Sequence, residues 1–228
     1  MIRPLMSRFF PRYFFVILLI FLSGMELAIF HDTMNQPGLK PYNATELQGK
    51  YTFTVQVVIP HMQDVFPLLF FLNSGIALFI FLVPIYWIWI WWFKPDFLPG
   101  VVYLMRATVF ILVFALGHNT FVSLYEMGKT LPFSILSTYL YPHGILEVLA
   151  YVLSGTFALV TIDKMKEFLQ QAKDPSSLHP GDICFFILQN MWISLVLVIV
   201  ILAVAAVIEC WVTPFMVASS LEKALNAL

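Results

Sequence analysis

The sequence predicts an all-α integral membrane protein, a bundle of about five transmembrane helices. The first reason is composition: 61% of the 228 residues are hydrophobic and only 11% are charged, whereas about a quarter of the residues are charged in soluble domains. The second is length, because several apolar runs exceed the ~18 residues that mark a candidate span. We therefore treat the whole chain, 1–228, as a single polytopic membrane domain.

The predicted spans follow one another along the chain, at about 13–30, 65–93, 101–125, 143–162 and 183–215. The second ends in "IYWIWIWWF", which is typical of an aromatic belt at a membrane interface. The fifth is long enough to tilt or break. The mildly amphipathic tail after it is expected to lie on the membrane surface.

Two segments between the spans need separate predictions. Residues 31–60 are predicted to form an extracytoplasmic loop, in which the weakly alternating "GKYTFTVQVVIP" indicates a short strand or an extended cover. The segment 126–142 contains Pro132 and Pro142. It is too short and too broken to span, so we expect a loop or a re-entrant piece.

The lysines and arginines predict the orientation. If the N-terminus is cytoplasmic, eight lie inside and four outside, which fits the positive-inside rule. The inside residues are Arg3, Arg8, Arg12, Lys94, Arg106, Lys164, Lys166 and Lys173, and the outside residues are Lys40, Lys50, Lys129 and Lys223. We therefore predict a multi-pass protein of the cell membrane with a cytoplasmic N-terminus.

The fourth predicted span carries the clearest polar pattern. His143 and Glu147 are four residues apart, so they share one helix face, and Tyr151 and Ser154 continue that face. An ionisable group in the bilayer core costs about 2.5–3.5 kcal/mol on insertion scales. This polar face is therefore expected to point into the bundle, where small residues admit a neighbouring helix closely.

Three other spans supply candidate partners. Glu209 lies in the fifth span beside two alanines, Asn119 lies in the third, and Asn73 lies in the second. Polar side chains in lipid need partners within the protein. We predict that helices two to five pack around Asn73, Asn119, His143, Glu147 and Glu209.

Three interpretations of this set remain open. The first is a structural hub, in which the polar groups hydrogen-bond and hold the helices in register. The second is a metal, proton or ion site, because the imidazole of His143 and the carboxylates of Glu147 and Glu209 would suit a divalent metal. The third is catalysis without a metal. The sequence has no HExxH, no Gly-x-Ser-x-Gly and no phosphate-binding glycine loop, so the case for an enzyme is weak.

Three stretches carry a family resemblance. "PHGILE" at 142–147, "FLNSGIALFIFLV" around Asn73 and "AAVIECWVTP" around Glu209 together resemble the stage II sporulation protein M family over residues 65–215. The residues that the resemblance marks are Asn73, Pro142, His143, Gly144, Glu147, Gly155, Glu209 and Pro214. Ser74 stands where the family often has a second Asn, and Asn119-Thr120 where it has Asn-Gly. These departures indicate a distant member.

The resemblance implies a membrane component that works with envelope-remodelling partners, and it does not imply a hydrolase. We therefore expect a non-enzymatic scaffold or a subunit of an envelope-associated membrane complex. The alternatives are a transporter or permease component that uses Glu147 and Glu209 as an ion or proton relay, and an intramembrane metal-binding protein or metalloenzyme. Expected partners are the lipid bilayer and other membrane proteins or further copies of the chain. The net charge of −1 gives no basic surface for nucleic acid.

Overall fold

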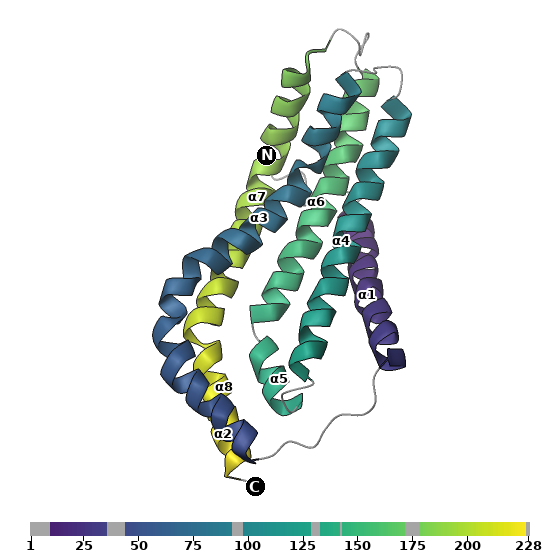
Figure 1. Cartoon of the computed structure of the whole chain (residues 1–228). Coiled ribbons are helices and arrows are strands. Elements are labelled where there is room, and N and C mark those ends of the chain that lie inside the picture. The colour runs from purple at the N-terminus through teal and green to yellow at the C-terminus, as the bar shows by residue number, and fades with distance from the viewer. Residues whose placement is uncertain are drawn as a thin grey trace.

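The computed structural model describes residues 10–35, 44–92, 98–128, 133–141, 143–171 and 178–226, which contain helices and no strand. The elements are α1 (Phe10–Asn35), α2 (Ala44–Phe53), the π-helix η1 (Thr54–Val58), α3 (Ile59–Trp92), α4 (Leu98–Gly128), α5 (Phe133–Leu140), α6 (His143–Gln171), α7 (Pro180–Trp211) and α8 (Thr213–Leu225) (Figure 1). Five helical stretches in these residues are long and apolar enough to cross a membrane. This confirms the predicted fold class.

Helix α6 is the centre of the bundle. In the stretch of α6 that qualifies as a span, 72% of residues are buried, against at most 33% in the other four. It contacts α1, α3, α4 and α7; in Figure 1, α3, α4 and α7 run beside its upper part, and α1 lies lower, beside α4. Because α6 has protein on several sides, its polar residues can find partners away from lipid.

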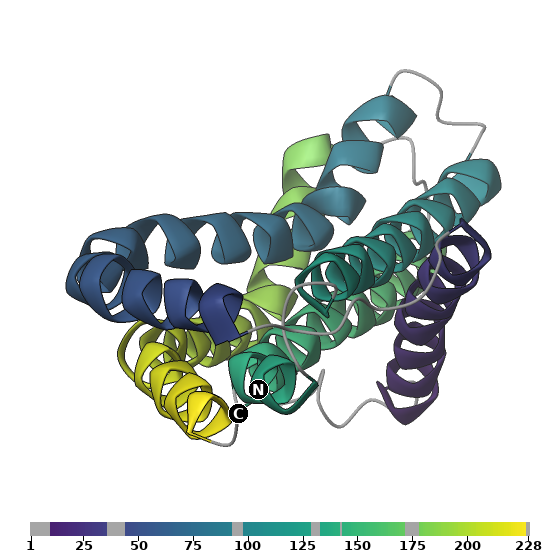
Figure 2. The same cartoon turned by 60° about the horizontal axis from the view of Figure 1, so that its bottom comes forward.

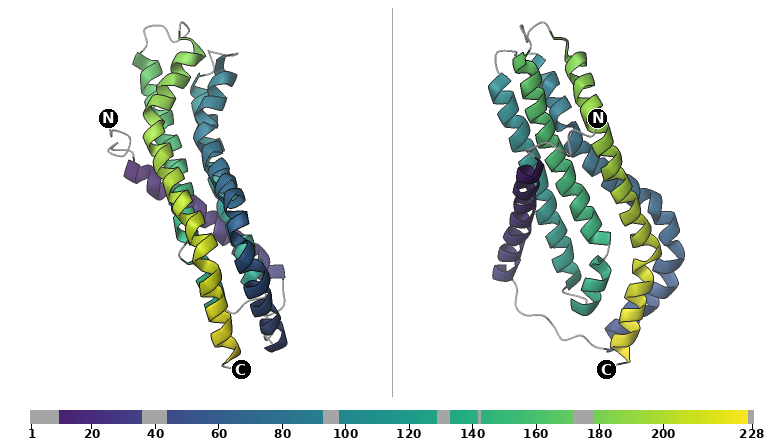
Figure 3. Two further views of the ribbon diagram at one scale, coloured as in Figure 1. Left: turned by 90° about the vertical axis from the view of Figure 1, so that its left-hand side faces the viewer. Right: turned by 180° about the vertical axis from the view of Figure 1, so that it is seen from behind.

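Helix α1 packs against the outside of α4 and α6 (Figure 3). Its crossing with α4 depends on two glycines. A Cβ on Gly24 would lie 2.3 Å from the carbonyl oxygen of Phe114, and a Cβ on Gly117 would lie 2.0 Å from that of Phe21. No side chain fits at these distances, so only glycine permits this close backbone approach.

The lower end of the molecule separates into two arms. One contains α2, η1, the start of α3, the end of α7 and α8; the other contains the end of α4, α5 and the start of α6 (Figure 1). Figure 2 shows α2 lying along α8 in the first arm, with α1 on the opposite side of the molecule. At 1.5 Å per residue, the 34 residues of α3 extend on the order of 50 Å, well beyond the ~30 Å hydrocarbon core. Helix α3 is therefore long enough to cross the hydrocarbon core at a tilt or with residues beyond it.

A small apolar cluster joins the two arms. Leu47 of α2, Ile135 of α5, and Val217 and Leu221 of α8 are buried together. Near them, the Ser220 hydroxyl donates to Thr138 Oγ1 at 3.3 Å. Thus α5 and α8, which are far apart in sequence, lie side by side.

The prediction of a loop with a short strand at residues 31–60 was wrong for the part that the structure describes. Residues 31–35 belong to α1, and residues 44–60 are helical through α2, η1 and the start of α3. The weak alternation of "TFTVQVV" misled the prediction. Apolar residues four apart, such as Leu47 and Tyr51, form a helical face that contacts the cluster of α2, α5 and α8.

Residues 126–142 also differ from the predicted loop. Helix α4 continues to Gly128, and Phe133–Leu140 form α5; Pro132 and Pro142 lie outside the described residues. Proline readily precedes a helix or follows its end, so its presence limits a helix without excluding one between two prolines.

The predicted fifth span does break, at Val212, where α7 ends and α8 begins. Pro214 occupies the first turn of α8, where its missing N–H is not needed. The amphipathic tail forms α8, which packs on α2 and α5 through its apolar face, including Val217 and Leu221. Its expected location at the membrane surface stays a prediction.

Candidate functional site

Asn73 connects α3 to α6 through two side-chain hydrogen bonds. Its amide nitrogen donates to Glu147 Oε1, and its Oδ1 accepts from the hydroxyl of Tyr151 at 3.0 Å. Glu147 and Tyr151 are four residues apart, so a single asparagine can bond both. This three-residue arrangement, the Asn73 bridge, satisfies polar groups that lipid cannot.

Glu209 approaches the same region from α7. It is close enough to Glu147 for the two carboxyl groups to interact electrostatically. Its Oε2 is buried and has no hydrogen-bond partner among the residues that the structure describes. Glu209 therefore faces the Asn73 bridge with unused hydrogen-bonding capacity.

His143 begins α6 and is only 4% exposed. Its Nδ1 lies 3.0 Å from Oγ1 of Thr213, the first residue of α8, and that hydroxyl also donates to the carbonyl of Ile208 at 3.3 Å. His143 thus fixes the start of α6 to the junction of α7 and α8. This contact was not anticipated, because Thr213 attracts no notice in the sequence except by preceding a proline.

The remaining predicted hub residue lies elsewhere. Asn119 is exposed on α4 and is not among the side chains that bond Glu147. On a helix with apolar residues around most of its circumference, sequence periodicity does not tell which face points inward. This explains why Asn73 could not be distinguished from Asn119 in advance.

The predicted metal set was His143, Glu147 and Glu209. Within the described ranges, no three or more His, Cys, Asp or Glu side chains gather closely enough to hold a metal ion. The contacts of the individual residues agree with this. The Nδ1 of His143 lies beside Thr213, while Oε1 of Glu147 accepts from Asn73.

A second polar group joins three helices and was missed from sequence. Asp163 of α6 accepts hydrogen bonds from Arg106 of α4 and from the hydroxyl of Tyr13 of α1. The Asp163 side chain is 12% exposed and the Arg106 side chain 36% exposed. The available signal was Arg106 itself, an arginine within the run "VVYLMRATVFILV", because an intramembrane charge requires a partner.

Gly155, marked by the family resemblance, lies between these two polar groups along α6. A Cβ there would meet Val113 of α4 at 2.9 Å and Ile17 of α1 at 3.2 Å. Small size at this position lets α1 and α4 pack together against α6.

The family model described as "Stage II sporulation protein M" matches residues 13–214. No curated protein and no solved structure matches the chain. The matched range contains the Asn73 bridge, Glu209 and the contact of His143 with Thr213.

Proposed function

Because this chain belongs to the stage II sporulation protein M family, we propose that it is a non-enzymatic scaffold or subunit of an envelope-associated membrane complex. The observation that carries the proposal is the use of intramembrane polar groups. The Asn73 bridge joins α3 to α6, and Asp163 joins α6 to α1 and α4. These bonds hold a rigid bundle, as a scaffold requires.

The test is the assembly state in native membranes. After extraction in mild detergent, we expect the 26.2 kDa chain to migrate in a defined larger complex of fixed stoichiometry. Substituting exposed apolar residues on the outside of the bundle should change the size of this complex, while the chain itself still folds. A chain that is monomeric at every concentration, with no companion at fixed ratio, would contradict the proposal.

Turnover by the isolated chain would also contradict it. The purified protein is incubated with lipid, peptide and glycan substrates, alongside the variant Glu147→Gln. We expect no turnover by either. Product formation by the natural sequence that disappears in Glu147→Gln would instead identify an enzyme.

A second candidate function is a transporter or permease component. Its support is the electrostatic interaction of Glu147 with Glu209, since paired acids in a membrane occur in proton and ion relays. Proton or sodium flux through reconstituted vesicles, abolished by Glu209→Gln, would favour this function. Flux equal to that of protein-free vesicles would dismiss it.

The third candidate, metal binding, rests on the residue types alone. Elemental analysis of protein purified without chelators tests it. Stoichiometric zinc, iron or manganese that is lost in both His143→Ala and Glu147→Gln would support a metal site.

A further inference from the structure

Helices α6 and α7 pack against each other and run in opposite directions (Figure 1). At their lower ends, the contact of His143 Nδ1 with Thr213 Oγ1, at 3.0 Å, fixes how the two helices are aligned. Glu147 and Glu209 stand one turn further into the bundle, each four residues from that contact. The alignment therefore places the two acids opposite each other, in agreement with the electrostatic interaction between their carboxyl groups.

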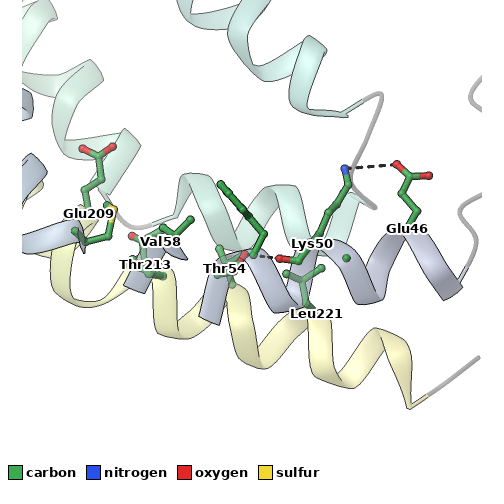
Figure 4. Close-up of a pocket in the computed structure, with 12 residues that line it drawn as sticks. Glu46, Lys50, Thr54, Val58, Glu209, Thr213 and Leu221 are labelled. Carbon is green, nitrogen blue, oxygen red and sulfur yellow. Dashed lines mark hydrogen bonds and ion pairs between the residues drawn. The ribbon is translucent and has the colours of Figure 1, made fainter. Parts of the chain in front are cut away.

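The carboxyl group of Glu209 is only partly satisfied by its surroundings. Figure 4 shows Glu209 beside Thr213 at one end of a pocket between α2–η1 and the junction of α7 with α8, with Glu46 at the opposite end. One of its oxygens, Oε2, is enclosed and has no hydrogen-bond partner in the described part of the chain. An unpartnered buried oxygen is rare in folded proteins. Nothing in the pocket can reach this atom, so its partner must be a group of the protein itself.

The groups that surround the two acids supply no compensating cation. Asn73 of α3 and Thr213 of α8 are uncharged. Among the residues that the structure describes, no lysine or arginine forms an ion pair with either acid, and the lysine of the pocket, Lys50, is paired with Glu46 at 3.6 Å. The other titratable or charged groups nearby are Tyr151 and His143 of α6, Cys210 of α7, and Glu46 and Lys50 of α2.

A single proton would supply what the two acids lack. Two ionised carboxylates offer only hydrogen-bond acceptors, so neither could be the partner of the other. A protonated carboxyl group donates through its O–H, and a neighbouring carboxylate accepts. Two carboxyl groups that share a site away from water also hold one proton in common, because like charges cannot both be accommodated there.

We propose that Glu147 and Glu209 bind one proton between them, and that the resulting O–H···O hydrogen bond fastens α7 to α6. Binding adds one proton to two carboxylates and leaves one negative charge. Release of the proton breaks the hydrogen bond and places two like charges in contact. The proton therefore acts as a clasp between the two helices.

This inference goes beyond the proposed scaffold role and requires no transport, since a bound proton need not move through the protein. The two proposals can fail separately. A chain that is monomeric in native membranes would contradict the scaffold and leave the shared proton unaffected. Absence of the shared proton would leave the size of the complex unaffected.

The test is infrared spectroscopy of the full chain in an alkyl maltoside detergent, which has no carbonyl group of its own. The C=O stretch of a protonated carboxyl group lies above the amide bands and shifts in heavy water. Labelling of glutamate with carbon-13 assigns the band to glutamate side chains. We expect the natural sequence at neutral pH to show this band with the intensity of one protonated glutamate per chain.

Variants identify the two acids. Glu147→Gln and Glu209→Gln each remove the like charge that retains the proton, so the pH at which the band is half lost should fall by at least about one unit in either variant. The double variant should lack the band. The matched control is Glu222→Gln, which removes an exposed acid of α8 and should leave both the band and its midpoint unchanged.

Thermal unfolding over the same pH range tests the hydrogen bond. The native pair keeps a proton that the separated acids of the unfolded chain release at neutral pH, so stability is lost as the pH rises through the titration of the band. We expect the unfolding temperature of the natural sequence to fall over that range. In Glu209→Gln, whose amide is a permanent donor, it should fall less than half as far.

Three results would overturn the proposal. The first is a natural sequence that shows no band of a protonated glutamate at neutral pH. The second is a band whose midpoint is the same in both single variants as in the natural sequence, because it would belong to another glutamate. The third is a stoichiometric metal ion that is lost in Glu209→Gln, since both carboxylates would then be ionised ligands.

Discussion

At the scale of single residues, Asn73 makes two hydrogen bonds that join α3 to α6. Its amide has a donor and an acceptor, and each meets a different residue of α6, Glu147 and Tyr151. An ionised carboxylate at position 73 would offer acceptors only and could not donate to Glu147. An amide provides the donor and the acceptor together without a change of protonation state.

Replacing Asn73 should weaken the bundle measurably. We expect Asn73→Ala to lower the free energy of unfolding by about 1–3 kcal/mol, since interhelical hydrogen bonds in membranes contribute about 0.6–2 kcal/mol each. Unfolding titrations in mixed micelles measure this. The matched control is the neighbouring Ser74→Ala: Ser74 Oγ is buried without a partner in the described residues, so its removal should cost nothing. Equal losses in both variants would contradict the Asn73 bridge.

The ion pair of Arg106 with Asp163 can be tested with a double-mutant cycle. Arg106→Met should destabilise the protein by about 2–4 kcal/mol, because it leaves the carboxylate of Asp163, which is mostly buried, with Tyr13 as its remaining described partner. The double variant Arg106→Met with Asp163→Leu should recover most of that loss, since removing both charges removes the uncompensated one. Additive losses in the double-mutant cycle would show that the two side chains do not interact.

The residues of the candidate site also show how much of that site could be predicted from the sequence. Asn73, Glu147 and Glu209 were predicted because a polar group within an apolar run needs a partner, and the structure brings all three to one region. Asn119 met the same criterion and lies exposed. Which of two asparagines turns inward depends on helix rotation, and the packing of neighbouring helices decides it.

At the scale of elements, the contact of α1 with α4 is set by backbone proximity. Gly24 and Gly117 face carbonyl groups of the opposite helix at distances that no Cβ tolerates. Hydrophobic attraction does not drive helices together in lipid, so close packing of small residues must do so. This contact holds α1 in place together with the bond from Tyr13 to Asp163.

Even a methyl group should disturb this contact. We expect Gly117→Ala to destabilise the protein by about 1–3 kcal/mol, because the helices must move apart to admit the Cβ. Gly75→Ala is the control: a Cβ at Gly75 on α3 meets nothing within 4 Å, and alanine favours the helix by up to about 1 kcal/mol. The thermal unfolding temperature in detergent should therefore fall for Gly117→Ala and rise for Gly75→Ala.

The long spans could be predicted from the sequence, whereas the short helices of the arms could not, and the reason is physical. Long apolar runs identify spans because lipid imposes one requirement on every residue of a run. The helices of the arms, α2, η1, α5 and α8, are short, and long-range packing stabilises them, as in the buried cluster that contains Leu47 and Leu221. Local sequence carries little information about such contacts.

At the scale of the whole molecule, the orientation proposed from the charges is testable. Gln171 ends α6 at one end of the bundle, and Glu222 lies in α8 at the other; both side chains are exposed. With a cytoplasmic N-terminus, a membrane-impermeant maleimide should label Glu222→Cys in intact cells and Gln171→Cys only after permeabilisation. The natural sequence, whose Cys184 and Cys210 are half-buried and buried, gives the background. The reverse pattern would invert the proposed topology.

The position of α1 has a consequence for how the protein is made. Chains are synthesised from the N-terminus, yet α1 packs on α4 and α6, which the ribosome completes much later. We therefore expect α1 to stay in the bilayer with its glycine face against lipid until the third span, α4, is inserted. Folding of this protein therefore includes a step in which α1 is captured by helices that are synthesised after it.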